Sequence, residues 1–276
     1  MSLSIRTNIA SLEAQVNLDS TQNALNSSMA RLSSGYRITS AGDDAAGLGI
    51  STKLEAQIAS YGQAARNAND GVSVIQTAEA GLNQDSNILT RLRELAMESA
   101  SDGVGDTERN YITTETNQLV SEIDRISNVT QYNGTNLLSG TTSTLTFQVG
   151  VNSTTNDQIA FSTIDATSAT LFGGATLDVS SDTAAASSLS TIDAALTAVS
   201  TALANLGAVG NRFQSTIANI QDASEALSAA DSRIKDVDVA SETSALARTE
   251  VLQQAGVSVL AQANQQPQLA LKLLGG

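Results

Sequence analysis

The sequence has 276 residues, and its 14 basic and 28 acidic side chains give a net charge of −14. This acidic balance argues against binding to nucleic-acid phosphates, which depends on lysine and arginine. Cysteine and histidine are both absent, which excludes disulfides, thiolate and imidazole metal sites, and imidazole bases. With 3% aromatic residues and no tryptophan, helical packing on small apolar side chains is favoured over a wide globular core. We therefore predict a mainly α-helical chain with no metal and no cofactor.

Residues 1–34 are predicted to form a helix. Apolar side chains recur there at three- and four-residue spacing, at Ile5, Ile9, Leu12 and Val16. Gly35 follows Arg-Leu-Ser-Ser and is a natural helix stop. The start of the chain lacks the continuous apolar stretch of a secretory signal, and no window of the sequence resembles a membrane span. Cytoplasmic residence and export by a route that reads other signals both remain open.

Residues 35–56 contain the stretch AGDDAAGLG, which suggests a phosphate loop, a calcium loop or a helix start. No Gly-Lys-Ser/Thr follows it, which disfavours the phosphate loop. An acidic pair before an alanine-rich run is typical of a helix N-terminus, where Asp43 or Asp44 bonds the free amides. We therefore interpret the segment as structural, with Gly47 and Gly49 permitting close approach between backbones.

Three further apolar seams predict three long helices. The first seam consists of Ile75, Ala78, Leu82, Leu89, Leu92 and Ala96, and the second of Ile112, Leu119, Ile123 and Ile126. The third takes steps of three and four residues from Leu189 to Leu227, and ten of its twelve positions are apolar. Such alternation of three and four is the signature of a left-handed supercoil. Glycines and aspartates within residues 101–110 predict a turn that makes the first two helices an antiparallel hairpin.

The middle of the chain differs in kind. Between Arg125 and Arg212 there is no lysine or arginine, and Ser, Thr, Gly and Asn dominate. Apolar residues alternate with polar ones on both sides of a turn at 152–156, at Leu145, Phe147, Val149, Val151, Ile159 and Phe161. This alternation predicts a β-hairpin. Beyond Thr163 the signal fades, and we interpret the residues after it as a polar surface excursion.

The last segment, residues 236–276, is predicted to be a helix with two apolar faces. One stripe includes Leu252, Val259, Leu269 and Leu273, and the second includes Val257, Leu260, Leu271 and Leu274. A helix that is apolar on two sides needs more than one packing partner.

Four long stretches of the sequence resemble the end regions of bacterial flagellins. They are RLSSGYRITSAGDDAAGLGIS (31–51), LRELAMESAS (92–101), EIDRISNVTQYNGTNLL (122–138) and VLQQAGVSVLAQANQQPQLALKLL (251–274). The resemblance covers about residues 1–165 and 190–276. It implies a core domain made from both termini, a coiled-coil-like rod of three main helices with a small β-hairpin region, and a filament subunit exported by flagellar type III secretion. The short interval between Phe161 and Leu189 implies little or no outer domain.

The resemblance also implies a division of the chain and a set of partners. The segments would be a core helix at 1–34, a connector at 35–56, rod helices at 57–130, a β-hairpin and variable surface segment at 131–188, a return helix at 189–235 and a core helix at 236–276. The partners would be further copies of the chain in a homopolymer, an export chaperone, and the filament cap and junction proteins. Neither nucleic-acid binding nor membrane insertion is expected. The protein would be secreted and extracellular, in the bacterial flagellum.

In a helical polymer, neighbouring subunits would cover the second apolar face, because a heterologous contact that does not close repeats along the filament. We assign to this assembly interface Ile5, Ile9, Leu12, Val16, Leu252, Val259, Leu260, Leu269 and Leu273.

The stretch TRLRELAM, residues 90–97, carries a second expectation. In a generic coiled coil its outer side chains would form a solvated face. In flagellins this patch is recognised by an innate immune receptor, the vertebrate flagellin-sensing Toll-like receptor. The resemblance carries that role to Arg91 and Leu95, and to Glu115 on the adjacent helix. We expect the three side chains to lie on the outer faces of neighbouring helices.

Two other functions compete with this interpretation. A hook–filament junction protein shares rod-like ends, although the continuous match of the tail through LAQANQQPQLAL favours flagellin. A helical enzyme with paired carboxylates would need acids in a dry pocket, whereas the acids here fall mostly on outer helix faces. We therefore expect a structural subunit of the flagellar filament and not an enzyme.

Overall fold

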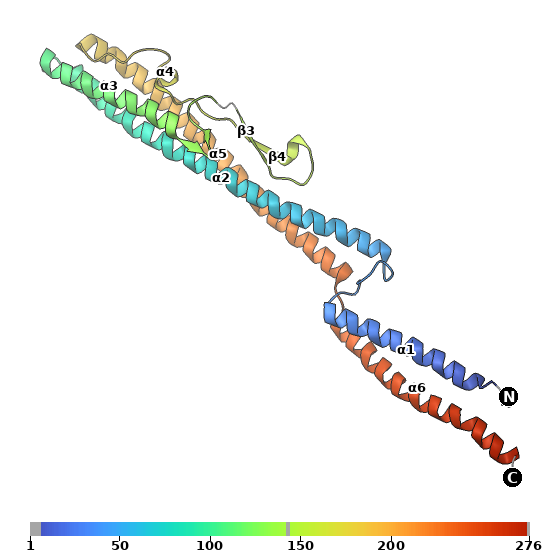
Figure 1. Cartoon of the computed structure of the whole chain (residues 1–276). Coiled ribbons are helices and arrows are strands. Elements are labelled where there is room, and N and C mark those ends of the chain that lie inside the picture. Colours follow the sequence, from blue (N-terminus) through green and yellow to red (C-terminus); the bar gives the residue numbers. More distant parts are fainter. Residues whose placement is uncertain (1–6, 142–143, 275–276) are drawn as a thin grey trace. The chain divides into compact units, whose positions relative to one another are not determined.

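The computed structural model describes residues 7–141 and 144–274, with side chains as far as residue 265 (Figure 1). The chain divides into two compact units. We call residues 57–225 the rod unit, and residues 1–56 with 226–276 the terminal unit. The described residues are mainly helical, and their strands form two small two-stranded sheets, which confirms the predicted fold class.

In the terminal unit, α1 (Ile9–Ser34) and α6 (Val239–Leu274) lie side by side and antiparallel (Figure 1). The Asn8 side chain caps α1 by accepting a hydrogen bond from the Ser11 amide at 3.1 Å. Gly35 ends the helix in the left-handed conformation, with φ of 76°, as predicted. The antiparallel register is visible in contacts along the pair, from Asn8 with Ala263 through Gln22 with Gln253 to Arg31 with Glu242.

The segment after α1 leads into α2 (Ala45–Ser99). As predicted for one of the two acids, Asp44 accepts a hydrogen bond from the Gly47 amide at 2.8 Å, at the start of this helix. A Cβ atom on Gly47 would lie 2.7 Å from the Cδ1 atom of Ile38, so the close approach at this position is to side chains and not, as we expected, between backbones. A Cβ on Gly49 would meet open space, so the expected close approach there is wrong.

Asp43 organises the preceding turn. Its Oδ2 atom accepts hydrogen bonds from the hydroxyls and backbone amides of Thr39 and Ser40, at 2.9–3.2 Å. These bonds, the Thr39 hydroxyl foremost, hold the pKa of Asp43 well below its usual value.

The rod unit is built on α2, α3 (Asp106–Val129) and α5 (Asp182–Lys235), which pack along one another (Figure 1). Most residues of the predicted seams lie in its core or pack against it, which confirms that the steps of three and four mark the buried faces of these helices. On α5 every seventh residue is fully buried, at Ile192, Val199, Leu206, Phe213 and Ile220. The turn between α2 and α3 falls within the predicted 101–110 stretch.

The predicted β-hairpin is also confirmed. Strand β3 (Leu145–Gln148) pairs antiparallel with β4 (Gln158–Phe161), in the register Leu145 to Phe161 and Phe147 to Ile159. The short 3-10 helix η1 (Thr155–Asp157) lies in the connecting turn. Sequence reasoning missed a smaller hairpin, β1 (Gln131–Tyr132) with β2 (Thr135–Asn136). Its two-residue turn places both Asn133 and Gly134 at positive φ.

The stretch beyond Thr163 is not the polar surface excursion that we expected. It contains α4 (Ser168–Leu171), and its Ala166, Phe172 and Val179 are buried in the rod core. Hydrogen bonds from two buried serine hydroxyls attach this stretch to the rod helices. Ser127 donates to the Ala166 carbonyl at 2.7 Å, and Ser99 donates to the Val179 carbonyl at 2.5 Å. Apolar residues spaced six or seven apart, without a regular period, left no pattern from which to predict this packing.

We expected no stretch of the sequence to resemble a membrane span, and for α5 this expectation was wrong. By its length and composition alone, α5 is a candidate membrane span. The reason is that the 23 residues from Leu189 to Asn211 include one charged side chain, Asp193. Its buried stripe packs in the core of the rod unit.

Candidate functional site

The predicted assembly residues of α1 are exposed in the subunit. Ile9, Leu12 and Val16 are 67%, 53% and 68% exposed. Toward α6, the helix buries a different stripe, which includes Ser11, Ala14, Leu25 and Ser28. Apart from Leu25, the side chains named in this buried stripe are small, while Ile9, Leu12 and Val16 face outward. Ile5, the first predicted member of this set, lies outside the described residues.

The predicted assembly residues of α6 are also at least partly exposed in the subunit. Leu252 and Val259 are more than half exposed, as are Val251 and Val257, while Leu260 is half-buried. These positions point in several directions around the helix, because 251, 252 and 257 do not share one face. The side chains of Leu269 and Leu273 lie outside the described residues, although α6 extends through both positions.

Large exposed apolar patches on a protein surface are often sites of contact with other molecules. Full burial of one valine or leucine side chain contributes about 1.5–3 kcal/mol. In the isolated subunit Ile9, Leu12 and Val16 are 53–68% exposed, so much of this stabilisation is not realised. Contact with a further molecule would bury the rest of these side chains.

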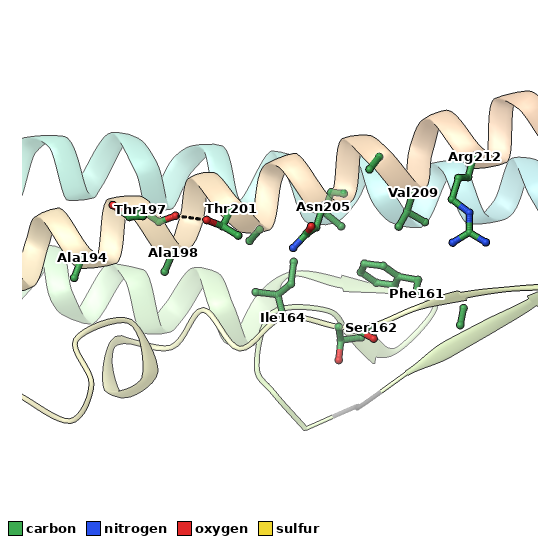
Figure 2. A pocket seen from close by; sticks show the side chains of 15 residues that line it. Phe161, Ser162, Ile164, Ala194, Thr197, Ala198, Thr201, Asn205, Val209 and Arg212 are labelled. Carbon is green, nitrogen blue, oxygen red and sulfur yellow. Dashed lines mark hydrogen bonds between the residues drawn. The ribbon is translucent and has the colours of Figure 1, made fainter.

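The rod unit has a groove that sequence reasoning missed. It has a volume of about 860 Å³ and runs between α5 and the segment from Ala160 to Ile164 (Figure 2). Small side chains of α5, such as Ala194 and Ala198, line one wall, Phe161 and Ile164 line the other, and Arg212 lies near one end (Figure 2). The alternating small residues of α5 gave no sign of a partner, because a helix face of Ala and Thr also suits plain solvent exposure.

No group of three or more Asp or Glu side chains in the described part of the chain is arranged to hold a metal ion. Several acids instead accept hydrogen bonds from the chain itself. Asp124, for example, receives the Ser168 amide at 2.8 Å and the Ser168 hydroxyl at 2.9 Å, which connects α3 to α4.

The predicted receptor residues separate into an exposed pair and a buried residue. Arg91 on α2 forms ion pairs with Glu115 on α3 at 2.9 Å and with Glu94 at 3.1 Å. All three side chains are about half exposed, so they form a charged surface patch.

We expected Leu95 to lie on the outer face of α2, but its side chain is buried and only 2% exposed. Helix α2 is covered from two sides, by α3 and α5, so its buried stripe is wider than the single seam through Leu92 and Ala96. Leu95 lies within that wider stripe and belongs to the rod core.

Comparison with known proteins decides the family. Residues 5–143 match the bacterial flagellin N-terminal helical region, and residues 189–274 match the bacterial flagellin C-terminal helical region. The chain belongs to the bacterial flagellin family. Flagellins are structural proteins of the flagellar filament and not an enzyme family, and this member, with 276 residues, is a short form without a large outer domain.

Related proteins align with this flagellin family member over nearly its whole length. A flagellin of Halalkalibacterium halodurans is 44% identical over 98% of this chain and 99% of its own length. A flagellin of Bacillus subtilis is 42% identical, and a flagellar filament 30.7 kDa core protein of Treponema maltophilum is 39% identical, with the same coverage of both chains.

Two solved structures share the fold. The crystal structure of Bacillus cereus flagellin is 27% identical, with a TM-score of 0.51, over 56% of this chain and 88% of that one. A putative flagellar hook-associated protein from Vibrio parahaemolyticus has a TM-score of 0.60 over 70% of this chain and 100% of that one, at 16% identity. The second likeness concerns the fold alone.

Proposed function

We propose that this member of the flagellin family polymerises through the outward apolar stripes of α1 and α6. The observation that carries the proposal is that Ile9, Val16 and Leu252 are exposed although the two helices pack on each other. A heterologous contact between such stripes repeats without closing and builds a filament. Before assembly, the same stripes would bind the export chaperone, and the cap and junction proteins would meet them at the filament ends. The filament would lie outside the cell, in the flagellum.

Polymerisation is expected to improve with ionic strength, most of all with sulfate or phosphate. Subunits of net charge −14 repel one another, and these salts both screen charge and strengthen apolar burial. The measurement is sedimentation of the purified chain at low salt, in sodium chloride and in ammonium sulfate, with negative-stain microscopy of the pellets. Long filaments in sulfate support the proposal. Equal yields in all three solutions would contradict it, and short caps or plugs that never elongate would favour a junction protein.

We also propose that the monomer is bound by the vertebrate flagellin-sensing Toll-like receptor through the patch of Arg91, Glu94 and Glu115. The resemblance to flagellins suggested this partner, and the support from the structure is that these charged side chains are joined by ion pairs on an exposed face. Leu95 would contribute only by holding α2 in place, since its side chain is buried.

Substituting Arg91→Ala is expected to weaken receptor binding by about 2 kcal/mol or more, because an arginine anchor at an interface centre often dominates the binding energy. Helicity should not change, since an exposed ion pair contributes little to stability. The measurement is a reporter titration of receptor signalling, with circular dichroism of each variant. Arg93→Ala is the matched control, because Arg93 is equally exposed but pairs with Asp193 on α5. Unchanged potency of Arg91→Ala would remove this residue from the site.

A further inference from the structure

The rod core contains an aspartate with no partner. Asp85 lies on α2 and is 0% exposed, and neither of its carboxylate oxygens has a hydrogen-bond partner. Its position is a core position of the helix seam, because Ala78, Leu82, Asp85, Leu89 and Leu92 follow one another at steps of three and four residues. Every other member of this series is buried and apolar.

The side of Asp85 that faces α5 offers no charge. The ion pair of Arg93 with Asp193 and the close approach of Phe213 to Gly71 set the antiparallel register of α2 and α5. In that register Asp85 lies level with the stretch around Val199. Between Asp193 and Arg212, α5 has no charged residue.

The side that faces α3 has charges, but they are engaged elsewhere. The contacts of Arg91 with Glu115 and of Gly81 with Thr130 place Asp85 level with residues 121–126. The ionisable groups of that stretch are Glu122, Asp124 and Arg125. Arg125 forms two hydrogen bonds with Glu122, at 2.6 and 2.7 Å, and Asp124 accepts from Ser168.

The remaining neighbours supply no cation either. Along α2 the nearest ionisable groups are Glu79 and Arg91, and Arg91 is paired with Glu94 and Glu115. The described residues of the segment packed against this part of the rod, 131–141 and 144–181, include no lysine or arginine. Its three acids accept hydrogen bonds from neighbouring residues: Asp157 from Thr154, Asp165 from Thr167 and Thr170, and Asp178 from Ser180.

A carboxylate in such surroundings has lost its hydrating water and has neither a hydrogen-bond donor nor a cation to replace it, which disfavours its charged form. We propose that Asp85 makes the stability of the rod unit depend on pH. The rod unit is more stable against unfolding when this side chain is neutral and less stable when it is ionised. The device lies inside one subunit and does not depend on polymerisation, so it stands or fails separately from the proposed function.

Burial raises the pKa of Asp85 from 3.8 to about 7. Below about pH 4 the side chain is protonated in both the folded and the unfolded state, and its full contribution to stability is present. Between pH 4 and pH 7 only the folded state holds the proton, so the unfolding equilibrium constant rises about tenfold per pH unit. Above pH 7 both states are ionised and the loss is complete.

The test is chemical unfolding of the full chain at pH 5 and pH 7 for the wild type, Asp85→Asn and Asp85→Leu. Neither substituted side chain can ionise. Relative to both variants, the unfolding constant of the wild type is expected to rise roughly fiftyfold between the two pH values, because at pH 7 about half of the folded chains still hold the proton. The matched control is Asp70→Asn, an exposed acid on the same helix, whose pH dependence should follow the wild type.

A second measurement keeps the proposal testable if a variant fails to fold. The infrared band of a protonated carboxyl should be visible in the folded wild type at pH 6, where ordinary aspartates are ionised. It should be absent from Asp85→Leu and present in Asp70→Asn. Equal pH dependence in the wild type and both Asp85 variants, or a wild-type spectrum without the band at pH 6, would overturn the proposal.

Discussion

Substituting Val16→Asp is expected to abolish polymerisation while leaving the helical content of the subunit unchanged. Val16 is 68% exposed in the subunit, so a carboxylate there stays hydrated and costs the monomer little. In the proposed filament the same position would be covered by a neighbouring molecule. Burying a charge without a partner costs several kcal/mol, and that cost recurs at every subunit.

The measurement is sedimentation in ammonium sulfate with negative-stain microscopy, and circular dichroism of the soluble protein. Two controls separate position from charge. Val16→Leu keeps the apolar stripe, and Ala175→Asp adds the same charge at an exposed loop of the rod unit. Both should polymerise. Normal filaments from Val16→Asp would show that the α1 stripe remains in water after assembly.

The second large effect concerns the contact between Phe213 and Gly71. Phe213 is fully buried and meets Phe147 edge-on, with ring centroids 5.5 Å apart, so it joins α5 to the β-hairpin. Phe213→Ala is expected to destabilise the rod unit by about 3–5 kcal/mol, through lost burial and the cavity that remains. Chemical unfolding followed by circular dichroism measures the loss, and a loss below about 1 kcal/mol would contradict this account of the core.

Gly71 tests the same contact from the opposite side. A Cβ atom there would lie 2.6 Å from the Phe213 ring, so Gly71→Ala should destabilise by about 1–3 kcal/mol even though alanine favours helices. Gly207→Ala, on α5, is the matched control, because a Cβ at that position meets open space. It should stabilise by about 0.5–1 kcal/mol. Adding Phe213→Leu to Gly71→Ala should recover part of the loss, because two residues in contact do not act additively.

Periodic patterns accounted for the helices and the larger hairpin. The steps of three and four on α2, α3 and α5 predicted seams that are buried in the structure, and the alternation around Phe147 and Ile159 predicted paired strands. Such patterns succeed because burial on one face of a regular element leaves its period in the sequence.

The features that the patterns missed have physical reasons. The placement of Leu95 was wrong because two partners cover α2, and a single seam cannot show a second covered face. The packing of residues 163–181 depends on hydroxyls of Ser99 and Ser127, which look like any other serine in a sequence rich in them. Asp85 could have been found, since the first seam steps over its position between Leu82 and Leu89.

Hydrogen bonds donated by Ser99 and Ser127, and one accepted by Asp124, anchor the chain on both sides of an exposed turn. At its tip, Gly173 and Gly174 both have positive φ, and a Cβ atom on either meets nothing within 4 Å. A foreign sequence inserted between these two glycines would leave these three hydrogen bonds in place on either side. The turn is therefore expected to tolerate an inserted peptide, which each subunit would display on its surface and a polymer would repeat along its length.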